Sequence, residues 1–277
     1  MDQSVGEKKA LEEIRKWEEE LFLHEPNDFQ LTFDKMVDLA FSYLPEKAKE
    51  EFFANVDTWL FHMNAFIQSL DMQKEAEERI LLAGRAFRED ILSISDMKKL
   101  PIEKLQFIAE QQIVRHRVYS FVQGAFAGTG QPLFLGADLP AVFVINMRAV
   151  QLIAASYGCE VNTPFEMMAS LKVFHCAAMP KRIKKQGWRE LIDELENGEQ
   201  QYFYGGNEKI SGSSSIEYFL KQVLKGMAIL LFKNRKLQNI PLLSMAIGAG
   251  ANYQLTKQVT DFAKKYYQMR YLLEQNK

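Results

Sequence analysis

Charged and amide side chains within apolar stretches are the residues of this sequence that could do chemistry. Asp138 and Arg148 lie in a segment that is otherwise almost entirely apolar, and Asn252 and Arg270 follow near the end of the chain. A buried charge is unfavourable unless it is paired. The first interpretation is structural ion pairing, in which Arg270 pairs with Asp138 or another carboxylate. The second is a buried polar pocket, formed by all four residues, that binds a small molecule or lipid headgroup or acts as an active site.

A second candidate is a basic patch of five cations within nine residues. Its members are Lys181, Arg182, Lys184, Lys185 and Arg189, with Trp188 among them. On a helix the patch could lie on an anionic membrane, each cation contributing about 1 kcal/mol, with Trp188 at the level of the headgroups. The alternative is a solvated helix face, neutralised by the four carboxylates between residues 190 and 196.

The sequence lacks the common motifs of nucleophilic, metal and nucleotide sites. It contains no GxSxG or HExxH, and its four histidines, including His116 and His175, are scattered. The glycine pairs at 128/130 and 248/250 lack a preceding strand and the P-loop lysine. We therefore expect no metal, no cofactor and no nucleotide site.

The composition is that of an ordinary globular protein of 277 residues. The chain has 34 Lys+Arg against 36 Asp+Glu, a net charge of −2, so no overall attraction to nucleic acid is expected. Two cysteines, Cys159 and Cys176, exclude a disulfide scaffold, and we expect both to be core thiols. The first twenty residues have no apolar stretch typical of a signal peptide, which predicts a cytoplasmic protein.

The elements that must position these residues are predicted to be helices. Apolar residues recur at three- and four-residue steps, and no period-two alternation is sustained. A helix over 138–157 would place Asp138 in its first turn and Gly158 at its carboxyl-terminal cap. The other predicted helices span 4–22, 32–43, 45–69, 75–91, 101–126, 163–179, 216–232, a segment from 241, and 252–275, with helix breaks at 128–136 and a flexible loop at 199–215.

Two stretches, 118–137 and 237–256, contain no charged residue. Their glycine, proline, glutamine and asparagine content makes a bilayer-spanning helix unexpected. Small residues four apart, Gly124 with 128 and Ala246 with Gly250, favour close packing of helices. The alternative is a glycine-lined helical hairpin that meets lipid.

Short motifs in the last two thirds of the chain resemble the EcsC family. They are a glycine-rich turn leading to an Asp-Leu-Pro helix, a Tyr-Gly helix end, a Pro-to-Asn helical hairpin, and a terminal helix with an arginine. Their residues are Gly128, Gly130, Asp138, Leu139, Pro140, Arg148, Tyr157, Gly158, Ile240, Pro241, Gly248, Ala249, Asn252, Tyr253, Ala263, Tyr267 and Arg270. The likeness covers roughly residues 110–273. After Gly158 the family tends to have an aspartate, whereas Glu160 is the acidic residue here.

The resemblance implies an accessory protein with no established reaction and supplies no catalytic residues. The family is named for a protein encoded beside an ABC transporter, which implies a non-enzymatic peripheral factor at the inner face of the cell membrane. The fold expected is all-α, a single domain of about eight to ten helices. In it, helices of 1–109 pack onto a glycine-rich core of 110–277. A third alternative, a soluble protein-interaction scaffold, predicts an exposed apolar patch on the amino-terminal helices.

Overall fold

The computed structural model describes residues 4–23, 67, 71–127, 132–179, 181–197 and 241–275. These residues form seven α-helices and one 3₁₀ helix, and none of them forms a strand. The elements are α1 (Val5–Phe22), α4 (Asp71–Arg85), η1 (Ser95–Lys99), α5 (Ile102–Ala127), α6 (Pro132–Ser156), α7 (Pro164–Ala178), α8 (Lys181–Asn197) and α10 (Pro241–Gln275). The prediction of an all-α single domain is confirmed. The helices predicted over 32–43 and 216–232, the loop at 199–215, and all of 45–69 except Ile67 lie outside the described residues.

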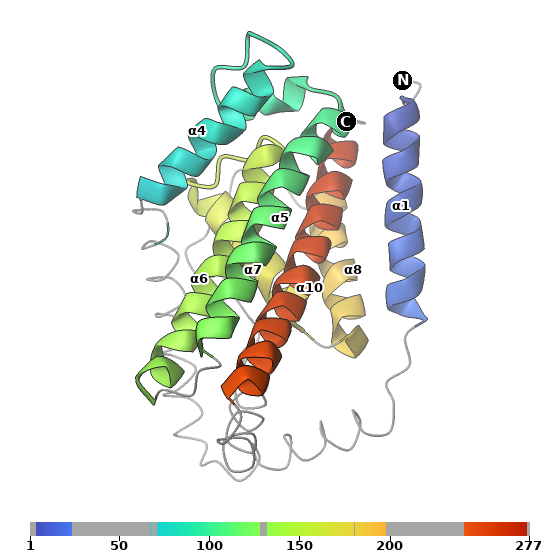
Figure 1. Ribbon diagram of the computed structural model, residues 1–277. Coiled ribbons are helices and arrows are strands. Elements are labelled where there is room, and N and C mark those ends of the chain that lie inside the picture. The colour runs from blue at the N-terminus through green and yellow to red at the C-terminus, as the bar shows by residue number, and fades with distance from the viewer. Residues whose placement is uncertain are drawn as a thin grey trace.

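Helices α5 and α10 run side by side through the middle of the molecule (Figure 1). Helix α6 packs against both of them, α7 packs against α6 and α10, and α1 and α8 pack on α10. The last turns of α5 and the first turns of α6 and α10 lie at one end of the bundle, the lower end in Figure 1. Helix α4, η1 and the last turn of α10 lie toward the opposite end.

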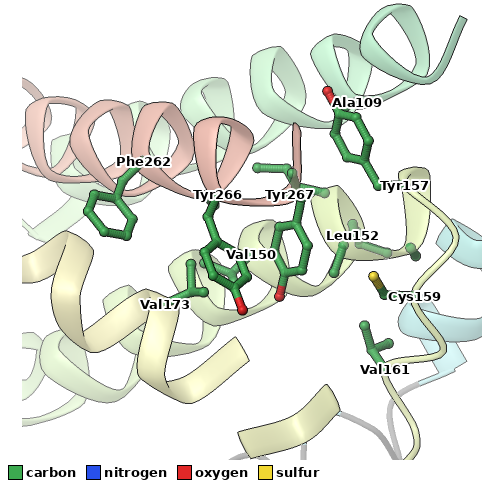
Figure 2. Close-up of a cluster of buried hydrophobic side chains, with 14 of the residues drawn as sticks. Ala109, Val150, Leu152, Tyr157, Cys159, Val161, Val173, Phe262, Tyr266 and Tyr267 are labelled. Carbon is green, nitrogen blue, oxygen red and sulfur yellow. The ribbon is translucent and has the colours of Figure 1, made fainter. Parts of the chain in front are cut away.

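The core forms where α10 faces α6 and α7. Figure 2 shows Phe262, Tyr266 and Tyr267 of α10 directed toward apolar side chains of α6 and α7, including Val150 and Val173. All five are buried, and burying a large apolar side chain stabilises a fold by about 1.5–3 kcal/mol. The α10 helix is therefore the central element of the core.

Helix α1 is joined to this core by aromatic contacts. It begins with a capping box, in which the Glu7 amide donates to Ser4 Oγ and the Ser4 amide donates to the Glu7 carboxylate. On its buried side Trp17 packs edge-to-face on Trp188 of α8 and Phe262 of α10, with ring centroids 4.8 and 5.6 Å apart. The first helix, predicted from its spacing and its Ser4 cap, is thus part of the same domain.

Two predicted helix boundaries are wrong. Helix α4 ends at Arg85, although the apolar pattern of 75–91 continues beyond it. Ile91 is buried but lies in a turn, where its carbonyl accepts a bond from the Arg85 side chain. Helix α6 begins at Pro132, because proline suits the first helical turn, and not at Asp138. Asp138 therefore lies in the second turn of α6, and residues 132–136 do not break the helix.

Other predicted boundaries are confirmed. Gly158 ends α6 with a positive φ of 82°, as a carboxyl-terminal cap requires. The Thr163 hydroxyl accepts a bond from the Glu166 amide ahead of α7, which has proline in its first turn.

The helical hairpin predicted between Pro241 and Asn252 is not formed, because 241–275 is one uninterrupted helix of 35 residues.

Candidate functional site

The described helices carry almost no charge where they reach the lower end of the bundle in Figure 1. Residues 118–127 of α5 and 241–256 of α10 contain no Asp, Glu, Lys or Arg. The first sixteen residues of α6 contain one, Asp138, whose side chain lies outside the described residues. These three segments meet at the same end, so the described parts of α5, α6 and α10 bring a single charged residue, Asp138, to that end. We call it the uncharged end.

The polar side chains near this end pair between α5 and α10. Asn252 Nδ2 donates to Gln123 Oε1 at 2.6 Å, and one turn further along α10 Thr256 Oγ1 donates to Ser120 Oγ at 2.7 Å. The next rung is Arg117, whose Nη2 donates to Asp261 Oδ1 at 2.6 Å. We call these six residues, together with Thr260, whose hydroxyl accepts from Arg117 Nε at 3.0 Å, the interhelix ladder. It turns the polar groups of both helices toward each other.

The outer face of the same part of α5 is apolar. Val118, Phe121 and Val122 are 53%, 50% and 46% exposed, while Ser120 between them is buried. Together with Val114 and Tyr119, both about half exposed, these side chains form the α5 apolar face. A helix on the surface of a protein in water normally has the reverse arrangement, with its apolar stripe inward. An exposed apolar face of this kind is typical of a surface that contacts a partner or a membrane.

Within the described part of the chain, no helix is both long enough and apolar enough to cross a membrane. A Cβ atom added at Gly250, on α10, would meet nothing within 4 Å. The predicted close packing at this glycine is thus wrong, because it faces open space.

The residues of the predicted polar pocket bond to different partners. Arg270 donates from both Nη atoms to the Glu166 carboxylate, at 2.8 and 2.5 Å, and from Nε to Glu274 at 2.9 Å. Asn252 belongs to the interhelix ladder. Arg148 Nε lies 3.4 Å from Gln73 Oε1 of α4.

These bonds do not bring the predicted residues into one pocket. Arg270, Arg148 and Asn252 have no hydrogen-bond partner in common among those described, and the side chain of Asp138 is not described. A carboxylate mate for Arg270 was predicted, and the structure shows that it is Glu166. Both partners are buried, which makes the bidentate pair a structural one.

The basic patch does not present its tryptophan to a membrane. Trp188 is 1% exposed, and its Nε1 donates to Glu18 of α1 at 2.6 Å. Lys184 is also buried, with its ammonium 6.0 Å from the ring of Phe262. Lys185 and Arg189 lie over the ring of Phe22, 4.9 and 5.0 Å from its centroid. The prediction that Trp188 lies at headgroup level is wrong, because α8 uses this face to hold α1; the side chains of Lys181 and Arg182 are not described.

The remaining motif residues have mostly structural positions. Tyr157 is buried, and burial raises the pKa of its phenol far above the ordinary value. Tyr253 is 37% exposed on α10 near the uncharged end. Pro140, Pro241 and Gly248 lie within helices, with their surroundings undescribed, and Gly128 and Gly130 lie outside the described residues. Burial raises the pKa of Cys159 and of Cys176 to about 12, so both are protonated core thiols, as predicted.

A buried polar cluster between α4, α5 and α6 was not predicted. His116 of α5 is 2% exposed, and its Nδ1 lies 2.9 Å from the backbone oxygen of Gln112. Burial, together with the positive charges of Arg148, Arg115 and Arg79, lowers the pKa of His116 to about 4. The imidazole is therefore neutral, and its Nε2 has no hydrogen-bond partner within the described structure. The histidine was visible in the sequence, but the three arginines come from three helices whose packing the sequence did not reveal.

Comparison with known proteins places the chain in one group of sequences. The model of a family described as the EcsC protein family matches residues 8–272. A relative from Bacillus subtilis (strain 168), "Uncharacterized protein YdbA", is 25% identical over 96% of this chain and 93% of its own length. A second from the same strain, "Protein EcsC", is 24% identical over 72% of this chain and 78% of its own length. No solved structure matches significantly.

Proposed function

The chain belongs to the EcsC protein family, and we propose that it is a peripheral membrane protein that inserts its uncharged end into one leaflet. The observation that carries this proposal is the arrangement of side chains on α5. Its apolar face points outward, while the interhelix ladder holds its polar groups against α10. Proteins meet lipid in this way, with apolar side chains outside and polar side chains bonded between helices.

The energetic argument favours insertion without a spanning helix. Each half-exposed Val or Phe of the α5 apolar face would gain about 1 kcal/mol by leaving water. Asn252, Gln123, Thr256 and Ser120 already bond to one another, so they add little to the desolvation that insertion requires. Together the five side chains of the α5 apolar face would contribute about 5 kcal/mol, which is comparable with the marginal, reversible membrane binding of a single acyl chain.

The resemblance to the EcsC family also implies a specific partner at the membrane, an ABC transporter. We include contact with such a transporter in the proposal. A protein attached to one leaflet is held close to the membrane segments of such a transporter. The α5 apolar face could pack against a transporter helix as well as against lipid. The buried-pocket alternative has no comparable support, because its described residues are engaged separately.

Flotation of the purified protein with vesicles tests the proposal. We expect wild type to float with neutral and with anionic vesicles, and to do so at high salt, because apolar insertion is not screened. The substitutions Val118→Glu and Val122→Glu together are expected to abolish flotation. The matched control carries Leu82→Glu and Leu92→Glu. These substitutions place the same two charges at apolar positions that are 60% and 74% exposed, on α4 and in the turn between α4 and η1.

The outcomes separate the possible attachments. Flotation lost in the Val118/Val122 variant and kept in the Leu82/Leu92 variant supports insertion of the uncharged end. Flotation of wild type only with anionic vesicles at low salt would contradict it and return the attachment to basic residues. No flotation under any condition would also contradict it and leave a protein partner as the occupant of the α5 apolar face.

A further inference from the structure

We propose that two copies of this chain associate along the outer side of α5, with the two α5 helices parallel and in register. The side chains that would meet are those of Phe107, Gln111, Val114, Val118, Phe121 and Ala125, which we call the α5 seam. The inference goes beyond the proposed function, because self-association in water needs no lipid. The α5 seam includes three residues of the α5 apolar face and continues past them toward the start of the helix.

The members of the α5 seam are spaced as in a coiled coil. They follow one another at steps of four, three, four, three and four residues, which keeps them on one side of a helix. In heptad notation the alternate members beginning with Phe107 take d positions, and those beginning with Gln111 take a positions. All of them are exposed or half-buried, whereas Gln112, Ile113 and His116 on the inner side of α5 are buried. A coiled-coil spacing on the outside of a helix that is already packed on its inside indicates a second helix as the partner.

Lipid would cover only part of the α5 seam. Phe107 and Ala125 are 18 residues apart, about 27 Å along a helix axis, whereas peripheral attachment buries apolar side chains only about 5–10 Å deep. With the uncharged end in a leaflet, Phe107 and Val114 stay outside it, although they are 54% and 58% exposed. The ring of Phe87, itself 41% exposed, lies 6.0 Å from that of Phe107 and extends this apolar surface. Cover for these side chains would have to come from protein.

Charges beside the α5 seam favour a second copy of this chain as that protein. Glu110 and Arg115 occupy a g position and the e position that follows it, on opposite sides of the seam. In a parallel pair of helices this g residue of one copy faces this e residue of the other, so the two-fold axis generates two Glu110–Arg115 pairs. In an antiparallel pair g faces g and e faces e, which would bring like charges together.

The same g residues also bond within their own copy. Glu110 forms a salt bridge with Lys264, and Arg117, at the next g position, bonds to Asp261. The Glu110 side chain nevertheless remains 45% exposed, and Arg115 is only half-buried. Both partners of the proposed pair are therefore accessible to a second copy.

Gln111 is the polar member of the α5 seam and would set its register. In a parallel, in-register pair the two Gln111 amides face each other, and an amide both donates and accepts hydrogen bonds. A single polar residue at an a position fixes the register and the number of helices in a coiled coil. The parallel orientation also places both uncharged ends on the same side of the pair, where they can enter the same leaflet.

Sedimentation velocity of the purified protein without lipid tests the association. We expect wild type to form dimers whose fraction increases with protein concentration. Arg115→Glu alone, or Glu110→Lys alone, places like charges at both symmetric pairs and should weaken self-association by roughly tenfold or more. Mixed in equal amounts, the two variants regain two pairs of opposite charge and should form a heterodimer. The control is Lys8→Glu, the same reversal of charge at an exposed position of α1, which should leave the dimer unchanged.

Crosslinking tests the orientation. A parallel, in-register pair brings the two thiols of Gln111→Cys together, so oxidised glutathione should link them into a covalent dimer. Lys8→Cys is the control and should remain unlinked. Cys159 and Cys176 are buried and do not interfere.

The outcomes are distinct from those of the proposed function. A wild type that is monomeric at every concentration would overturn the inference, and so would a dimer that neither charge reversal weakens while thermal unfolding shows both variants to be folded. Failure of Gln111→Cys to crosslink would overturn the parallel register. Flotation with neutral vesicles is read on wild type and on Arg115→Glu, which leaves the uncharged end intact. Absence of flotation in both contradicts the proposed insertion and does not affect the result on the dimer.

Discussion

Arg270 and Glu166 form the buried ion pair on which the junction of α7 and α10 depends. Both side chains are only 9% exposed, so removing one leaves the other as an uncompensated buried charge. We expect Arg270→Met to lower the free energy of unfolding by about 3–5 kcal/mol, measured by urea denaturation. The exposed pair of Lys16 with Glu12 is the control, and Lys16→Met should change stability little. A small effect at Arg270 would show that the pair is replaceable by packing.

His116 gives the protein a defined sensitivity to acid. Its pKa is lowered to about 4 by burial and by Arg148, Arg115 and Arg79, whereas an unfolded histidine titrates near 6.5. Between these values the unfolded chain binds more protons, so stability decreases as the pH falls from about 6.5 to 4. For this one residue the loss is roughly 3 kcal/mol at pH 4.

Replacing the histidine measures this contribution. His116→Gln should flatten the dependence of unfolding free energy on pH by one proton over that interval, in urea titrations at a series of pH values. His175, whose pKa burial also lowers to about 4, remains in the variant and sustains part of the slope. An unchanged slope would mean that His116 takes up its proton without unfolding.

At the level of elements, Gly158 determines how α6 ends. Its φ of 82° is strained for any other residue, and an added Cβ would lie 2.5 Å from Lys98 Cγ. Gly158→Ala should destabilise the fold by about 1–3 kcal/mol. Gly250→Ala is the matched change inside α10, where the added Cβ meets nothing, and it should stabilise by about 0.5–1 kcal/mol. Chemical denaturation of both variants checks the opposite signs; destabilisation in both would argue against the local explanation.

Helix signals that depend on neighbouring residues could be predicted from the sequence. The Ser4 cap of α1, the Thr163-Pro164 start of α7 and the Gly158 end of α6 are all formed as expected. The early start of α6 could not be predicted in this way. Glycine at 136 favoured a helix break, whereas the helix begins at Pro132 and continues through it.

Facts that depend on packing could not be predicted in the same way. Periodicity in α8 does not reveal that Trp188 faces α1, since its partners Glu18 and Trp17 are about 170 residues away. The two uncharged stretches were visible in the sequence. That the α5 apolar face points out while Ser120 and Gln123 point in follows only from the position of α10.

At the level of the whole molecule, the proposed insertion predicts which backbone amides are protected from exchange by lipid. Hydrogen–deuterium exchange with and without neutral vesicles should show slower exchange in residues 118–127 and 241–256. Residues 71–99, toward the opposite end in Figure 1, should exchange as in the free protein. Protection at α4 or η1 in place of the uncharged end would reverse the proposed orientation.

Helix α10 extends without interruption from Pro241 to Gln275. At 1.5 Å per residue its 35 residues form a rod about 52 Å long. Asn252 lies about a third of the way along this rod and Thr256 near its middle, whereas Arg270 and Glu274, which bonds to Lys98, lie near its carboxyl-terminal end. Because the helix has no break that could absorb bending, we expect a tilt imposed on its amino-terminal part by the proposed attachment to shift the contact between Glu274 and Lys98. Attachment near one end of α10 would then be detectable as a displacement at its opposite end.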